Sequence, residues 1–227
     1  SQYSKSAKPK EITELEKIVR SRKDFKSITE ITTKRNPFGI NTDFFKKYGD
    51  YGLKELKYEK ETGNDIKIYC ANNTSVYVPN NFKFPKINMS LKKYKVLVPY
   101  AWGNMSEKSG LGGAFSDIII AYPNEAATET YLISGIFETK EEAKKHSKYL
   151  MTKFARALLY VNKTSQHSTK SWGSVPRQDY SEDWWSGSIK EIDEWLMKKY
   201  SVPEEIKNFV FNNFQTKDES NIINYYD

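Results

Sequence analysis

The pattern of apolar residues changes part-way along this chain of 227 residues. Between residues 66 and 136 the apolar residues come in short runs separated by Asn, Pro and Gly, which predicts strands. The predicted strands cover residues 66–70, 75–78, 95–98, 118–121 and 130–136. After residue 139 apolar residues recur every three or four positions behind Ser/Thr-x-x-Glu pairs, which predicts helices that begin with capping boxes. The pairs are Thr139 with Glu142, Ser188 with Glu191 and Ser201 with Glu204.

The order of the two patterns predicts an α+β fold. A small, twisted sheet of mixed or antiparallel strands with loops would be followed by a helical C-terminal part over about residues 139–227. One uninterrupted helix is expected over residues 139–161, and another over residues 11–22 near the start. No clean linker divides the chain, so the sequence predicts a single domain. Because the chain begins with Ser rather than Met, we expect a piece of a longer protein.

Cysteine usage and hydropathy bear on the compartment. Cys70 is the single cysteine and cannot form an internal disulfide, which favours a reducing, cytoplasmic location. No apolar run approaches the roughly 20 residues that a membrane-spanning helix needs. We therefore expect no membrane partner.

Carboxylates are distributed unevenly along the chain. Residues 66–106 and 143–178 contain no Asp or Glu, yet they contain 14 Lys and Arg side chains. If both stretches lie on one face, the protein presents a surface of a single sign, which suits a polyanion such as DNA. Phosphate contacts are predicted for Lys92, Lys93, Lys95 and Arg177, and Trp102 is a candidate for stacking on a base.

A polar segment at residues 163–172 is the strongest candidate for reading DNA bases. Glutamine can bind adenine through two hydrogen bonds, and Ser and Thr can bind phosphates or base edges. A solvated loop would have a similar composition, so the segment alone leaves both interpretations open. The candidate residues are Lys163, Thr164, Ser165, Gln166, His167, Lys170 and Trp172.

The segment Asn36-Pro37-Phe38-Gly39 invites comparison with the Asn-Pro-Pro-aromatic turn of DNA amino-methyltransferases. The second Pro is missing, and no strand, glycine-rich turn and helix for a methyl donor accompany it. We therefore favour a structural turn beside a DNA-facing Arg35, with Arg35 and Asn36 reaching base edges. No catalytic residue and no metal site are predicted, since His146 and His167 lie apart in the sequence without Cys or acidic residues at ligand spacing.

Two other classes of function remain open. Asp43, Glu55 and Lys57 fit the Asp…Glu-x-Lys pattern of metal-dependent nucleases, in which two carboxylates hold the metal and the Lys assists the attacking water. The second alternative is a non-enzymatic module that binds RNA or protein.

Several segments resemble, in the same order, Eco57I-like adenine-N6 methyltransferases of restriction–modification systems. They are residues 34–42 with Pro-Phe-Gly, the strand Tyr94–Pro99, residues 129–131, residues 141–156 and residues 175–193. The family commonly has Lys where Asn36 stands. The resemblance implies a C-terminal target-recognition domain, similar to the specificity modules of type I restriction systems, that reads double-stranded DNA. It implies no cofactor in this fragment, whereas a methyltransferase domain of the same polypeptide would use S-adenosylmethionine. Whether the parent enzyme also cleaves DNA stays open.

Overall fold

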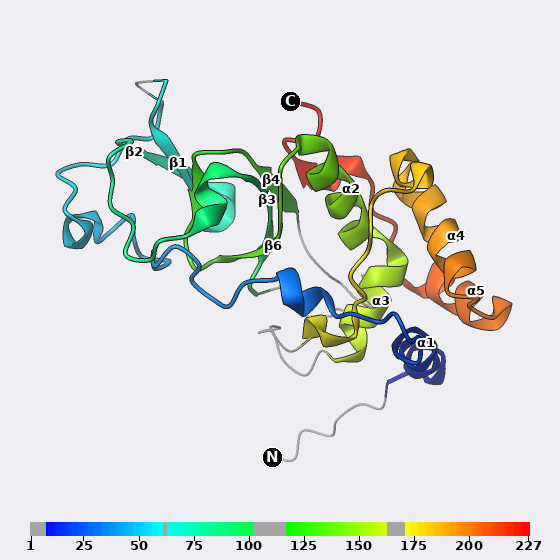
Figure 1. The fold of residues 1–227 in the computed structure, drawn as a ribbon. Coiled ribbons are helices and arrows are strands. Elements are labelled where there is room, and N and C mark those ends of the chain that lie inside the picture. Colours follow the sequence, from blue (N-terminus) through cyan, green and yellow to red (C-terminus); the bar gives the residue numbers. More distant parts are fainter. Residues whose placement is uncertain (1–7, 61–62, 102–116, 163–170) are drawn as a thin grey trace, which may run out of the picture. The chain divides into compact units, whose positions relative to one another are not determined.

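The computed structural model describes residues 8–60, 63–101, 117–162 and 171–227 (Figure 1). They form an α+β fold, which confirms the predicted class. The chain divides into two compact units, each made from separate stretches. We call residues 31–102, 115–147 and 220–227 the sheet unit, and residues 1–30, 103–114 and 148–219 the helical unit. Within the described ranges, no helix is both long and apolar enough to cross a bilayer.

The sheet unit contains two small mixed sheets. The first has the order β2-β1-β5 and consists of β1 (Ile66–Tyr69), β2 (Ser75–Val78) and β5 (Glu125–Ala127). The second has the order β6-β3-β4-β7 and consists of β3 (Tyr94–Pro99), β4 (Ile118–Ala121), β6 (Tyr131–Phe137) and β7 (Ile222–Ile223). The pairs β1–β5 and β4–β7 are parallel, and the other pairs are antiparallel.

All five predicted strands form, but β5 and β7 were not predicted. They have only three and two residues, too few to show an alternation of apolar and polar residues. Each forms because it completes the hydrogen bonds along a neighbouring strand, β1 for β5 and β4 for β7.

One apolar core draws on both sheets of this unit. Ile68 of β1, Leu97 of β3 and Ile133 of β6 belong to it, together with Phe38 and Phe44 from the chain before β1. Rings also cluster at its margin: Phe82 and Phe84 meet edge to face with their centroids 4.9 Å apart. The aromatic residues of the sequence therefore fix the irregular segments around the strands as well as filling the core.

The helical unit contains α1 (Lys10–Arg20), α3 (Lys153–Val161), α4 (Ile189–Lys199) and α5 (Glu204–Asn213). The remaining helix α2 (Lys140–Met151) belongs to the sheet unit up to Ser147 and to the helical unit from Lys148. Helix α3 contacts α1, α4 and α5 and is nearly all buried, so it is the centre of this unit.

The single helix predicted over residues 139–161 is wrong, because the chain breaks at Thr152. This residue has an extended ψ of 151° and its Oγ1 accepts the backbone N–H of Ala155, which makes it the N-cap of α3. From α4, the buried Asp193 carboxylate accepts the N–H groups of Lys153 and Phe154, each at 2.8 Å. Side chains thus accept the N–H groups of the first turn of α3, which would otherwise lack a partner. A continuous helix through Thr152 would therefore add no net hydrogen bond for these groups.

Two predicted capping boxes are present and the third is wrong. Glu191 accepts the N–H of Ser188, whose Oγ accepts the N–H of Glu191 in return. The same exchange joins Thr139 and Glu142. In contrast, Ser201 has a left-handed φ of 51° and ends α4, while α5 begins after Pro203 without a side-chain cap.

Candidate nucleic-acid interface

Two irregular segments of the sheet unit are fastened to one another. We call residues 36–39 the Asn36 turn and residues 83–93 the lysine segment. The Lys86 N–H donates to the carbonyl of Phe38 at 3.2 Å, and the Lys86 ammonium donates to the carbonyl of Asn36 at 3.0 Å. The Asn88 amide donates to the carbonyl of Pro37 at 3.1 Å. These three bonds hold the lysine segment against the turn.

The sequence of the Asn36 turn fits this close approach. Asn36 and Gly39 both have left-handed φ values, 60° and 78°, which Asn tolerates and Gly adopts freely. A Cβ on Gly39 would lie 2.7 Å from the Cβ of Pro85 and 3.0 Å from the Lys86 nitrogen. The amide of Asn36 donates to the side chain of Asn41 at 3.0 Å. Asn-Pro-Phe-Gly therefore forms a tight turn against which the lysine segment packs.

Arg35 directly precedes this turn, and its side chain is held by two partners of its own. Its guanidinium lies 3.0 Å from Glu129 and 4.7 Å from the centroid of the Tyr100 ring. Glu129 also accepts the backbone N–H of Thr42 at 3.1 Å. About half of the Arg35 side chain stays exposed, so a second anion can still reach the guanidinium.

Lys92 and Lys93 differ in the charge of their partners. The Lys92 ammonium donates to the neutral side-chain oxygen of Asn124 at 2.9 Å. Lys93 forms an ion pair with Glu138 at 2.5 Å. Both side chains are accessible, and of these two lysines Lys92 is the one whose partner carries no negative charge.

The burial of Lys95 corrects its expected role as a phosphate contact. Its side chain has no exposed surface, and its ammonium donates to the carbonyls of Tyr122 and Glu125, both at 2.9 Å. Burial lowers the pKa of Lys95 to about 7. Because no part of its side chain is exposed, Lys95 cannot contact a ligand on the surface.

Trp172 and Arg177 lie in the helical unit. Trp172 is fully buried, so its proposed place in a base-reading loop is corrected to a place in the core. Arg177 is exposed, and its guanidinium lies 3.7 Å from Glu30. The backbone N–H of Arg177 donates to the carbonyl of Lys26 at 2.7 Å. This bond fixes the backbone at Arg177 but does not restrain its side chain.

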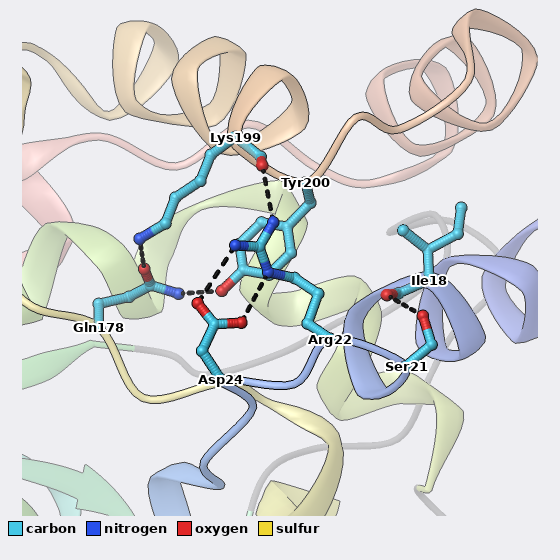
Figure 2. Close-up of polar contacts among 7 residues, drawn as sticks. All are labelled: Ile18, Ser21, Arg22, Asp24, Gln178, Lys199 and Tyr200. Carbon is cyan, nitrogen blue, oxygen red and sulfur yellow. Dashed lines mark hydrogen bonds and ion pairs between the residues drawn. The ribbon is translucent and has the colours of Figure 1, made fainter.

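A polar network that includes Gln178, the residue after Arg177 in the chain, joins the ends of α1 and α4 (Figure 2). The Arg22 guanidinium binds the Asp24 carboxylate at 2.9 Å and donates to the carbonyl of Lys199 at 3.2 Å. The hydrogen bond from Arg22 holds the pKa of Asp24 below its usual value. Lys199 donates to Gln178, whose amide donates to the Tyr200 hydroxyl at 2.9 Å. Because a cation sits at the C-terminus of α4, this network stabilises the helix end.

Several cations of the carboxylate-free stretches turn inward in the helical unit. Lys148 donates to the carbonyl of Gly187 at 2.7 Å, and Lys153 to that of Phe211 at 2.6 Å. Arg156 is buried and donates to the carbonyls of Met151 and Gln215. The lack of Asp and Glu in these stretches did not reveal this role, because a backbone carbonyl can accept a hydrogen bond from a cation in place of a carboxylate.

An open groove of about 440 Å³ lies in the sheet unit and was not predicted. Its charged lining consists of Lys54, Lys57, Lys83 and Glu55, and its rings come from Tyr51, Tyr77 and Phe82. Glu55 and Lys57 of the nuclease hypothesis thus lie in this groove, while Asp43 forms an ion pair with Lys47 at 2.7 Å and is not part of its lining. Basic residues interleaved with rings are typical of nucleic-acid surfaces.

His146 is buried in the sheet unit and binds the hydroxyl of Ser134 through Nε2 at 2.9 Å. Burial lowers its pKa to about 3, so the imidazole is neutral at pH 7. Across the described part of the chain, no three His, Cys, Asp or Glu side chains group as metal ligands.

The other predicted contacts lie outside the described residues. They are Trp102, Lys163, Thr164, Ser165, Gln166, His167 and Lys170. Comparison of the chain with protein-family models finds no match, and comparison with curated proteins finds no match either.

Proposed function

We propose that the sheet unit binds double-stranded DNA and that the chain is the target-recognition domain of a restriction–modification methyltransferase. The observation that carries this proposal is the attachment of the lysine segment to the Asn36 turn. It fixes the Lys86 ammonium 3.0 Å from the carbonyl of the residue that follows Arg35. Lys86 is therefore fixed against the residue that follows Arg35 before any ligand arrives, which lowers the entropy lost on binding.

The partners of these cations also favour a phosphate ligand. The ammonium groups of Lys86 and Lys92 bind neutral oxygens, so a phosphate that contacts them displaces no carboxylate from these hydrogen bonds. Lys83 and Lys54 add charge along the groove. The ion pairs of Arg35 and Lys93 with Glu129 and Glu138 would be exchanged for phosphate contacts, or would orient these side chains.

The base-reading role comes from the polar composition of residues 163–170, and the methyl transfer comes from the sequence resemblance. In this proposal the segment 163–170 reads base edges, and a methyltransferase domain of the same polypeptide supplies S-adenosylmethionine and completes the grip on the duplex. The sheet unit supplies phosphate contacts that do not depend on the DNA sequence and that fix the position of the protein along the duplex.

Salt-dependent binding tests the proposal. Lys86→Gln and Lys92→Gln should each weaken binding to a selected duplex and to its scrambled version alike. Because each phosphate contact releases about 0.9 counterion, each change should reduce the slope of log K against log salt by about 1. Fluorescence anisotropy of labelled duplexes at four or more salt concentrations would measure affinity and slope.

Lys207→Gln is the matched control, because Lys207 lies 2.8 Å from Glu194 and 3.9 Å from Glu204. The same loss of charge there should leave the slope unchanged. If the affinity of the wild-type chain for DNA did not change with salt concentration, the proposal would be contradicted. Stronger binding to single-stranded RNA than to duplex DNA would instead support an RNA-binding module.

A further inference from the structure

The lysine segment exposes two large apolar side chains. Ile87 is 99% exposed and Met89 is 87% exposed. Single apolar side chains on a surface are ordinary, but here two such residues, separated by one position, project from the same short segment. Their exposure leaves apolar surface in water that a partner could cover.

Their exposure is imposed by an ordered backbone. Between them, Asn88 points the other way, donating to the carbonyl of Pro37 and accepting the N–H of Ser90 at 2.9 Å. Ser90 is buried, and Met89 begins a short 3-10 helix, Met89–Lys92, that Asn88 caps. The chain is thus fixed on both sides of Ile87, and the two apolar side chains are presented outward together.

The positive charge around these two residues indicates which kind of partner would bind them. Residues 66–101 contain no Asp or Glu, and Lys83, Lys86, Lys92 and Lys93 flank the pair. A partner must therefore be anionic and must also offer apolar surface within reach of the anionic groups. Duplex DNA has both, since its phosphates border grooves in which thymine methyl groups and the faces of opened base steps can be contacted.

We propose that Ile87 and Met89 form an apolar wedge that enters a groove of duplex DNA and partly unstacks a base step, while Lys86 and Lys92 bind the flanking phosphates. This inference rests on the proposed function and adds a deformation of the duplex to it. The wedge would favour flexible pyrimidine–purine steps, because these unstack at the lowest free-energy cost.

The test uses the whole chain with both positions changed, Ile87→Ser together with Met89→Ser. Both side chains are exposed, so the melting temperature should stay as in the wild type. Affinity for the selected duplex should fall by about 10-fold to 100-fold, which corresponds to the loss of roughly 50–110 Å² of buried apolar surface. The salt slope should not change, because no phosphate contact is removed. A 2-aminopurine base scanned through the duplex should brighten at one step with the wild type and stay dark with the variant.

Tyr226→Ser is the control, because Tyr226 is 80% exposed and belongs to the same unit. It should leave both the affinity and the 2-aminopurine signal unchanged. If the double variant binds with wild-type affinity and signal, the wedge is wrong while DNA binding stands. If the wild type does not bind DNA, the proposed function fails and the wedge fails with it. Loss of binding by the double variant to vesicles of anionic lipid, with DNA binding intact, would assign the pair to a membrane surface and overturn the wedge.

Discussion

At the scale of single residues, Lys95 shows how a cation is kept inside a sheet. Two backbone carbonyls, of Tyr122 and Glu125, accept its hydrogen bonds at 2.9 Å. Removal from water still penalises the charged form, and the attraction of the Glu125 carboxylate offsets only part of that penalty, so the pKa falls to about 7. The residue is therefore a titratable group within the core.

Lys95→Met should remove a pH dependence of stability. The unfolded chain keeps the ordinary lysine pKa near 10.5, so between about pH 7 and pH 10.5 it binds one more proton than the folded chain. The wild type should thus gain stability as the pH rises through this window, by about 1.4 kcal/mol per unit, relative to the variant. Urea unfolding of both proteins at pH 7, 8 and 9 gives the difference in their free energies of unfolding. The contributions of other titrating groups cancel in this difference. Parallel pH profiles would contradict the low pKa.

At the scale of elements, the end of α4 is built on a residue in an unfavourable conformation. Ser201 has a φ of 51°, and its N–H donates to the carbonyl of Lys198 while the N–H of Val202 donates to that of Met197. This pair of bonds is the Schellman arrangement, in which the left-handed position is usually Gly. Because Ser201 is used to end α4, it is not available to cap α5.

Ser201→Gly should stabilise the protein by about 0.5–1 kcal/mol, since Gly adopts a positive φ without the steric penalty of a Cβ. Ser21→Gly is the matched control. Ser21 ends α1 with a right-handed φ of −73°, and its hydroxyl donates to the carbonyl of Ile18, so this change should destabilise. Thermal unfolding midpoints of the two variants should move in opposite directions. A fall in both would contradict the assignment of strain to Ser201.

At the scale of the whole molecule, the two carboxylate-free stretches serve different units. Residues 66–101 of the first stretch lie in the sheet unit, and most of the second stretch lies in the helical unit. In the helical unit Lys148, Lys153 and Arg156 bind carbonyls, so much of the positive charge of the second stretch stabilises the fold. The proposed phosphate contacts therefore come mainly from the sheet unit, and the base contacts from residues 163–170.

This division of roles predicts different outcomes for different substitutions. Gln166→Ala should change the preferred DNA sequence, costing about 1–3 kcal/mol at the one base pair whose adenine it reads, and should leave the salt slope unaltered. Selection of binding sites from a random duplex pool by the wild type and the variant would show the change. Equal weakening for all sequences would instead place Gln166 on a phosphate.

The sequence alone determined the α+β class, five strands, the two capping boxes that form and the turn at Asn36-Pro37-Phe38-Gly39. Each depends on neighbouring residues, whose periodicity and conformational preferences are readable locally. Only the tertiary structure decided that Lys95 and Trp172 are buried, that β5 and β7 pair, that the helix breaks at Thr152 and that Ile87 and Met89 project together. Those outcomes depend on partners far away in the chain. The hydrogen bonds of a lysine can be accepted by distant carbonyls or by water, and its own sequence surroundings do not distinguish the two.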